Sequence, residues 1–283
     1  MPRQAMEKAP WEGGLPRLIL LATDLSCRCD RALDRAVLLA QQWRAKLLVV
    51  HVLEGTEPRD PPPLDLARRQ VEADLEGRSV EWELALERGE PAEAILRQAQ
   101  AQGAGLIVTG VARRDPLGES TLGAIVEQLA KQAPIPLLAV KGRARRPYAR
   151  LVVATDFSEP SRHAIACARA LLPDTEMALF HAYRLPFEGF IGKDGNESEL
   201  RAMAEGEAAA FLKAEPSSPP LRMEYGWPES ALSAHVRKEA IELAMLGTQG
   251  RTGLKGFLVG SVAKRLMACL PCDVLVVRGP EAG

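Results

Sequence analysis

An internal repeat constrains the fold more than any other feature, because five segments of the first half recur in the second half in the same order. The repeat aligns Asp24 with Asp156 and His51 with His181. The paired segments are residues 18–24 with 151–156, 47–52 with 177–182, 89–91 with 226–228, 106–110 with 243–247, and 135–142 with 272–279. Ordered recurrence of this kind is typical of a duplicated domain, so the 283-residue chain is predicted to contain two similar domains.

Each half alternates apolar runs with segments of helical periodicity. Strands are predicted at residues 18–22, 47–53, 79–86, 106–109, 137–140, 151–155, 243–246 and 274–277, and helices at 30–44, 65–76, 91–100, 120–132, 161–172, 199–214 and from 261 onward. Such alternation favours right-handed crossovers and a parallel sheet. We therefore predict an α/β fold of two tandem doubly wound domains, residues 16–142 and 148–280, each a five-stranded parallel sheet flanked by helices. Residues 143–148, rich in arginine, are predicted to be a solvated connector.

Composition excludes several classes of protein. The net charge of −1 gives no electrostatic footprint for nucleic acid, and no apolar run is long enough to cross a bilayer. The first residues carry charges and glycines where a signal peptide has an apolar core, so we expect a cytoplasmic protein with neither nucleic acid nor membrane as a partner.

The five cysteines do not suggest a disulfide framework, because their number is odd and the chain is of ordinary size. Cys269 and Cys272 have the CxxC spacing, but they are predicted to close a helix, whereas a redox pair opens one. We interpret both as small buried residues. Cys27 and Cys29 lack a second pair at ligand spacing, so we predict no metal site.

A glycine-rich loop between a strand and a helix is the strongest candidate for chemistry. Its spacing is Gly247-x2-Gly250-x9-Gly260-Ser261, after the apolar run 243–246 and before a helical pattern. Free backbone N–H groups and the helix dipole favour an anion at such a helix start, and glycine lets the backbone approach phosphate oxygens. The hydroxyl of Ser261 can cap the helix or bind a phosphate. The spacing is neither a Walker A loop nor a GxGxxG fingerprint. The alternative is a flexible surface connection.

This spacing resembles the nucleotide-binding signature of the universal stress protein family, in its ATP-binding branch. The resemblance covers both halves and implies the strand order 3-2-1-4-5 in each. It further implies that the family's pairing through the last strand can occur here within one chain, between residues 137–140 and 274–277, with a homodimer as a further option.

The resemblance also assigns roles in the second half. Asp156, which follows the first strand of that half, would lie by the adenosine, although it can equally cap the next helix. Ala182 would contact adenine through its backbone. Gly247, Gly250, Gly260 and Ser261 would surround ribose and phosphates, while Val262 and Ala263 would donate backbone N–H groups. Arg251 and Lys255 lie in the loop, where they can neutralise phosphate or remain solvated.

The first half departs from the signature. It contains Gly110-x2-Arg113-x9-Gly123-Ala124, so an arginine replaces the second glycine and an alanine replaces the serine. We interpret this as a loss of tight nucleotide binding, although Arg113 and Arg114 can attract phosphate by charge.

The sequence therefore predicts a tandem universal stress protein that binds ATP, ADP or AMP, with or without Mg²⁺, in its C-terminal domain and signals to a protein effector. We predict no catalytic residues. His51 and His181 are interpreted as histidines satisfied near a sheet edge. Two alternatives remain: a slow ATPase or self-phosphorylating enzyme with Ser261 or Thr252 as the acceptor, and an interaction scaffold without nucleotide.

Overall fold

The computed structural model describes residues 14–53, 63–111, 122–184, 197–214, 219–248 and 260–279. Ten strands form a single sheet in the order β3-β2-β1-β4-β5-β10-β9-β6-β7-β8. The strands are β1 (Leu18–Ala22), β2 (Lys46–Leu53), β3 (Trp82–Arg88), β4 (Leu106–Gly110), β5 (Leu137–Val140), β6 (Arg150–Ala154), β7 (Glu176–Tyr183), β8 (Leu221–Tyr225), β9 (Leu243–Gly247) and β10 (Asp273–Val277). Each half thus has the order 3-2-1-4-5, which confirms the predicted doubly wound α/β fold.

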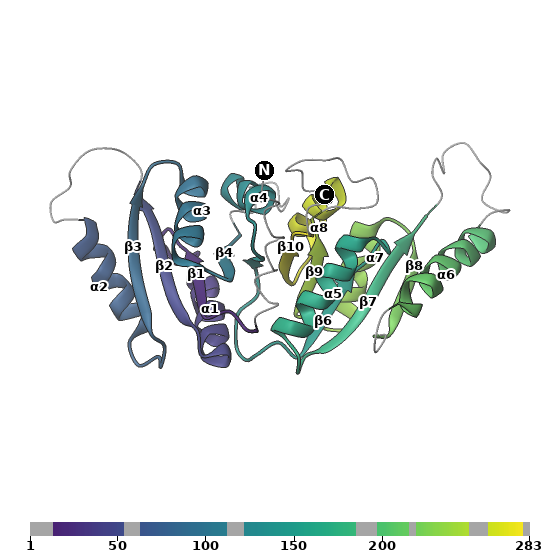
Figure 1. Ribbon diagram of the computed structural model, residues 1–283, viewed down its shortest axis with the longest axis horizontal. Coiled ribbons are helices and arrows are strands. Elements are labelled where there is room, and N and C mark those ends of the chain that lie inside the picture. Colours follow the sequence, from purple (N-terminus) through teal and green to yellow (C-terminus); the bar gives the residue numbers. More distant parts are fainter. Residues whose placement is uncertain are drawn as a thin grey trace, which may run out of the picture.

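Helices cover both faces of the sheet (Figure 1). They are α1 (Asp30–Trp43), α2 (Pro63–Leu75), α3 (Pro91–Gln102), α4 (Ala124–Gln132), α5 (Glu159–Leu171), α6 (Glu197–Lys213), α7 (Pro228–Lys238) and α8 (Ser261–Cys269). Buried residues of α1, α2, α5 and α6 share one apolar cluster with the sheet, and those of α3, α4, α7 and α8 share the other. Because each cluster includes strands of both halves, the two halves are packed as one three-layered body.

The halves meet edge to edge through their last strands. β10 pairs with β5 in antiparallel register, with Leu275 opposite Leu138, whereas the strands within each half pair in parallel. This confirms that the last strands pair within one chain. Pairing of this kind covers two sheet edges that would otherwise be templates for association.

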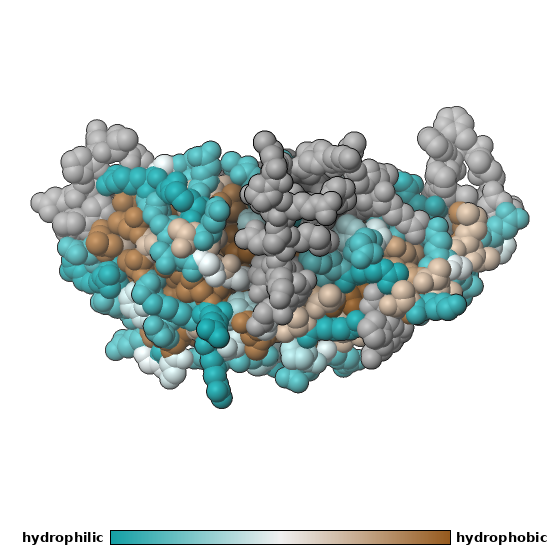
Figure 2. Space-filling view, viewed as in Figure 1, coloured by the Kyte–Doolittle hydropathy of each residue, from teal (hydrophilic) through white to brown (hydrophobic). Residues whose placement is uncertain are grey.

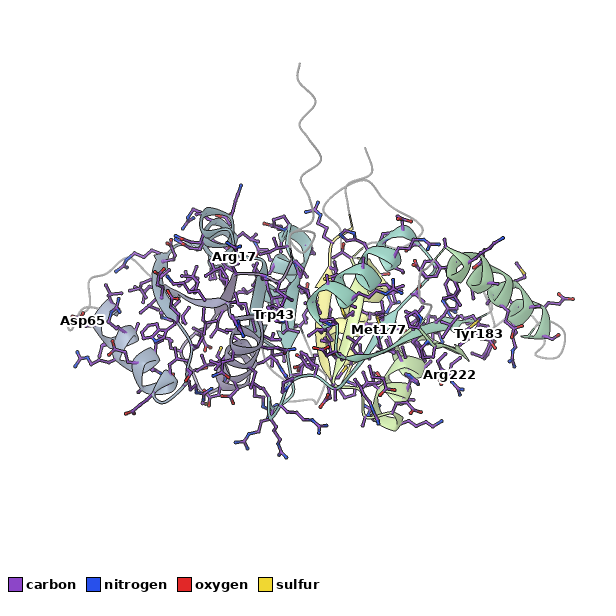
Figure 3. The ribbon with its side chains drawn as sticks, turned by 60° about the horizontal axis from the view of Figure 1, so that its bottom comes forward. Arg17, Trp43, Asp65, Met177, Tyr183 and Arg222 are labelled. Carbon is purple, nitrogen blue, oxygen red and sulfur yellow. The ribbon has the colours of Figure 1, made fainter. Side chains whose placement is uncertain are left out.

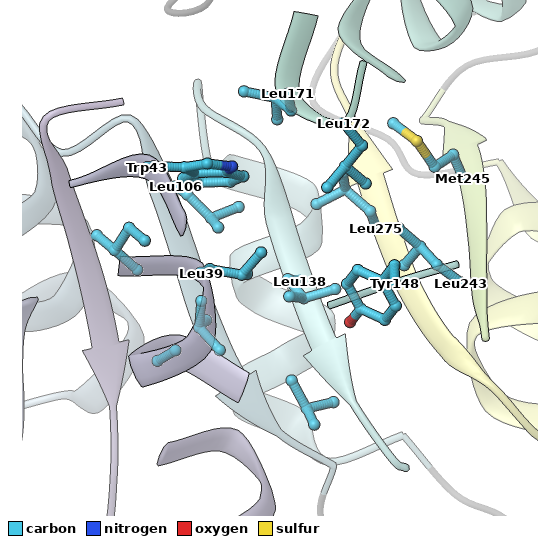
Figure 4. Packing of buried hydrophobic residues seen from close by; sticks show 14 of the residues in the cluster. Leu39, Trp43, Leu106, Leu138, Tyr148, Leu171, Leu172, Leu243, Met245 and Leu275 are labelled. Atoms are coloured by element: carbon cyan, nitrogen blue, oxygen red, sulfur yellow. The ribbon is translucent and has the colours of Figure 1, made fainter. Parts of the chain in front are cut away.

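Apolar side chains from both halves fill the seam between them. Figure 4 shows Leu138 of the first half near Tyr148, and Trp43 farther away on the first-half side; Trp43 lies toward the middle of the molecule in Figure 3. In Figure 2, hydrophilic residues cover much of the visible face, and apolar residues show between them. The helices within the described ranges are all too short or too polar to span a membrane.

Some predicted boundaries are wrong. Helix α2 begins two residues before the predicted start, at Pro63, because proline is tolerated in the first turn of a helix. Helix α4 begins at Ala124 rather than at residue 120, since Gly123 has the extended backbone of an N-cap. The connector is not wholly solvated either, because Tyr148 is buried in the seam.

Candidate functional site

A cavity of about 360 Å³ lies in the second half, at the carboxyl ends of β6, β7 and β9. The first turns of α7 and α8 form part of its wall. Its lining residues are Ala154, Thr155, Asp156, Ser161, Phe180, His181, Ala182, Pro228, Leu232, Leu246, Gly247, Thr248, Gly260, Ser261, Val262, Ala263 and Leu266. In doubly wound sheets this is the topological switch point, and the volume is within the range of small-molecule pockets.

Seven of the eight binding residues predicted from the sequence line this cavity. They are Asp156, Ala182, Gly247, Gly260, Ser261, Val262 and Ala263. The eighth, Gly250, lies outside the described residues, as do Thr252, Arg251 and Lys255. The fold thus brings together residues that are up to 107 positions apart in the chain (263 − 156).

The N-terminus of α8 faces the cavity without a side-chain cap among the described residues. Gly260 is the N-cap, and its N–H donates to the carbonyl of Thr248 at 2.8 Å. Ser261 is the first helical residue rather than the cap, so the capping role considered for its hydroxyl does not occur here. The first turn contains the cation Lys264 and no acidic residue. The uncapped N–H groups therefore favour an anion.

The carboxylate of Asp156 organises the turn between β6 and α5. Its Oδ1 accepts a hydrogen bond from the backbone N–H of Ser158 at 3.1 Å and from the hydroxyl of Ser161 at 2.9 Å, and also from the Ser158 hydroxyl. Helix α5 begins at Glu159 with Ser158 as its N-cap. Asp156 therefore holds the N-cap residue and a first-turn hydroxyl, and is not itself the helix cap.

His181 is held in place at the end of β7. Its Nδ1 lies 2.8 Å from the carbonyl oxygen of Thr155, which can only accept, so the ring donates from that nitrogen. The ring also packs on Phe157, with centroids 4.3 Å apart. His51 makes the matching contact with Thr23 at 3.0 Å in the first half. Both contacts agree with the interpretation of these histidines as satisfied side chains at the strand ends.

Gly247 allows β9 to approach the first turn of α5 closely. A Cβ at this position would lie 3.0 Å from the carbonyl oxygen of Pro160 and 3.1 Å from its carbonyl carbon. At the matching Gly110 of the first half, the nearest atom to such a Cβ is 3.5 Å away, an ordinary contact. The close approach is therefore a feature of the second half.

Thr248 is a lining residue that sequence reasoning missed. The residue is 6% exposed, and its Oγ1 has no hydrogen-bond partner among the described residues. A buried hydroxyl without a partner is costly, which makes Thr248 an unusual residue beside the cavity. The aligned residue of the first half is Val111. The polar residue at a position where the first half has an apolar one is the sequence signal that could have identified Thr248.

The first half keeps the turn but changes its chemistry. Asp24 Oδ1 accepts from the Ser26 N–H at 2.9 Å and from the Cys29 thiol at 3.1 Å, so a thiol stands where the second half has the Ser161 hydroxyl. Hydrogen bonds with Ser26 and Cys29 outweigh the effect of burial, which by itself would raise the pKa of Asp24, and the net shift is downward. Burial raises the pKa of Cys29. Helix α4 has the acidic Glu127 in its first turn, where it pairs with Lys264 of α8 at 2.8 Å. Arg113 and Arg114 lie outside the described residues.

The CxxC cysteines end α8 and precede β10, as predicted. Cys272 is buried, and burial with the nearby Asp273 raises its pKa to about 12. Cys269 is exposed, so the prediction that both are buried is wrong for this residue. The difference arises because Cys269 is the last residue of the helix, whereas Cys272 enters the sheet.

Two doubly wound domains with a cavity at the switch point of the second define a Rossmann-like α/β protein. The sequence model of the universal stress protein family matches residues 16–141 and 147–278. The chain belongs to that family.

Several proteins of known sequence or structure are similar to this chain. A universal stress protein of Methanocaldococcus jannaschii is 28% identical over 143 residues, which cover 47% of this chain and 84% of that protein. The crystal structure of a putative universal stress protein from Pseudomonas aeruginosa covers 94% of both chains, with 21% identity and a TM-score of 0.70. A universal stress protein from Archaeoglobus fulgidus, solved in complex with dAMP, covers 45% of this chain and 98% of its own, with 24% identity and a TM-score of 0.36.

Proposed function

We propose that the second half, residues 148–280, binds an adenine nucleotide in the cavity, and that the chain acts as a cytoplasmic stress-response regulator which passes the bound state to a protein effector. The observation that carries the proposal is the meeting of seven predicted residues in one cavity beside an uncapped helix N-terminus. Residues 16–142 would keep the fold without a tight nucleotide site.

The cavity offers separate surroundings for the parts of a nucleotide. Phe180, Leu232 and Leu266 provide apolar surface for a base, next to the backbone of Ala182. Asp156 lies where it can accept from a ribose hydroxyl, and the start of α8 provides N–H groups for phosphate. Thr248 and Ser261 also line the cavity. Apolar walls with a few convergent polar groups are the usual design of a cofactor site.

Binding is better supported than catalysis. Asp156 and His181 are the titratable side chains in the described lining, and each is already engaged by hydrogen bonds within the protein. A general base needs a lone pair that can reach a nucleophile. Slow hydrolysis or self-phosphorylation on Ser261 remains the second candidate, because this exposed hydroxyl lies at the helix start where phosphate would bind.

Calorimetry with ATP, ADP and AMP tests the proposal, run once with Mg²⁺ and once with EDTA. We compare the wild type with Gly260→Asp and with the matched Gly123→Asp in the first half. The carboxylate at 260 would lie at the anion-binding helix start, so it should abolish binding, whereas Gly123→Asp should leave it intact. A wild type that ignores millimolar nucleotide would favour the interaction scaffold.

A turnover assay on the same proteins separates a regulator from an enzyme. Product that forms in the wild type and disappears with Gly260→Asp would favour the slow ATPase, while product that survives the substitution would indicate a contaminant.

Self-association must use a surface other than the last strands, because β5 and β10 already pair with each other.

A further inference from the structure

The helix that faces the cavity is held by side chains of the first half at both of its ends. At its carboxyl end, the Nζ of Lys141 donates to the carbonyl oxygens of Met267 at 2.5 Å, Ala268 at 3.2 Å and Leu270 at 2.8 Å. In its first turn, Lys264 pairs with Glu127 of α4 at 2.8 Å. Lys141 and Glu127 both belong to the first half, whereas the cavity belongs to the second.

The antiparallel seam explains how Lys141 reaches α8. Because β5 and β10 run in opposite directions, the residue that follows β5 lies beside the start of β10. Helix α8 ends just before that start. The last carbonyls of a helix have no partner within the helix, and a cation there satisfies them and complements the dipole.

The backbone of Lys141 is itself fixed from two sides. The N–H groups of Lys141 and Gly142 both donate to Asp273 Oδ1 at 2.7 Å, and the carbonyl of Lys141 accepts from Arg31 of α1 at 2.7 Å. Asp273 is 1% exposed and also accepts from the Tyr148 hydroxyl at 2.6 Å. The ammonium group is thus presented to α8 from a rigid backbone.

The carboxylate that fixes the backbone of Lys141 occurs on one side of the seam. The repeat aligns Asp273 with Pro136, which has no carboxylate to receive the corresponding N–H groups of Arg278 and Gly279. The carboxylate of Asp273 therefore holds the residue whose side chain contacts α8, and α8 is the helix that follows the complete glycine signature. A duplicated domain has no structural need for this asymmetry, but a site confined to one half does.

We propose that the first half sets the position of the phosphate-facing end of α8, with Lys141 as the positioning residue, so that nucleotide affinity in the second half depends on a side chain of the first. The inference rests on the proposed function. Helix α8 has nine residues and is therefore only about 13 Å long, so a rigid-body shift at its carboxyl end would also displace the N–H groups at its start. The first half would then position α8 and so influence the affinity of the second-half site for nucleotide.

The test compares ATP with adenosine in calorimetry, using Lys141→Met and Lys141→Arg. Adenosine lacks phosphate, so a change in the position of the α8 N-terminus should affect ATP alone. We expect Lys141→Met to weaken ATP binding about fivefold, adenosine binding to stay within about twofold of the wild type, and Lys141→Arg to restore most of the loss. Lys131→Met removes an exposed lysine from the last turn of α4 and serves as the matched control.

Two results would overturn the inference: an unchanged affinity for ATP in folded Lys141→Met, or an equal loss for ATP and adenosine, which would indicate a general structural role. If the methionine variant does not fold, Lys141→Gln is judged by the same comparison. Failure of the wild type to bind ATP at all would instead refute the proposed function.

Discussion

Replacing Gly247 by alanine tests the reasoning about the second-half site most directly. The added Cβ would lie 3.0 Å from the carbonyl oxygen and 3.1 Å from the carbonyl carbon of Pro160. Both are backbone atoms in the first turn of α5, so no flexible side chain can turn aside. Either the end of β9 or the turn that holds Asp156 must move by a few tenths of an ångström.

The cost can be estimated from the behaviour of overpacked interiors. Inserting a methyl group into a close contact typically destabilises a protein by about 1–3 kcal/mol. The 283-residue chain has an unfolding entropy of about 0.6 kcal/mol/K, so this corresponds to a decrease in Tm of about 2–5 °C. The same substitution at Gly110 meets its nearest atom at 3.5 Å, so its effect should remain within about 0.5 kcal/mol.

The assay is thermal unfolding of both variants followed by circular dichroism, together with ATP titration of each. Gly247→Ala should lower Tm and weaken nucleotide binding, because Gly247 and Asp156 line the same cavity. Gly110→Ala should change neither property. Equal effects of the two substitutions would show that the close approach to Pro160 does not distinguish the halves.

Three further predictions follow from buried titratable groups. Asp273→Ala should destabilise the fold by about 3–5 kcal/mol in urea unfolding, because it leaves the 5%-exposed cation of Arg35, 3.5 Å away, without its carboxylate partner. Asp273→Asn keeps an oxygen for the N–H groups of Lys141 and Gly142, so it should destabilise the fold less. Equal destabilisation by the two substitutions would contradict this account. Desolvation lowers the pKa of His235 below its usual 6.5, so as the pH drops below about 6.5 the unfolded chain takes up a proton before the folded chain does. Stability in urea unfolding should therefore fall below about pH 6.5, and His235→Gln should flatten that part of the pH profile; the same slope in both proteins would contradict this account. In native protein at pH 8, iodoacetamide should label Cys27 and Cys269 but not Cys272, whose pKa is about 12; peptide mapping that finds rapid labelling of Cys272 would refute its burial.

Much of the fold could be predicted because the same pattern of strands and helices recurs in the two halves of the sequence. A strand that is apolar at every position, such as Leu18–Ala22, is recognisable because both of its faces are buried. Boundaries were less accurate where a terminal residue tolerates two conformations. Pro63 can close a loop or open a helix, and the packing of α2 against the sheet decides which.

The candidate site was predicted in part. Gly247, Gly260 and Ser261 have a recognisable spacing, and Asp156 and Ala182 could be placed by resemblance to a family. Thr248 could not be found in this way, because a threonine after a strand has no special meaning until its hydroxyl is seen to be buried without a partner among the described residues. Gly247 was expected to serve phosphate, but its contact with Pro160 shows that it also lets two elements of the fold approach each other.

The sequence by itself determined the duplication, the α/β class and the half that carries the complete signature, because these depend on local patterns and on comparison of the two halves. Only the tertiary structure decided how the halves act on each other. Lys141, Glu127 and Asp273 have no local pattern that marks them, and their roles arise because antiparallel pairing of β5 with β10 brings distant parts of the chain together. Contacts between residues more than a hundred positions apart depend on the register of the sheet, which a linear pattern of residue types does not specify.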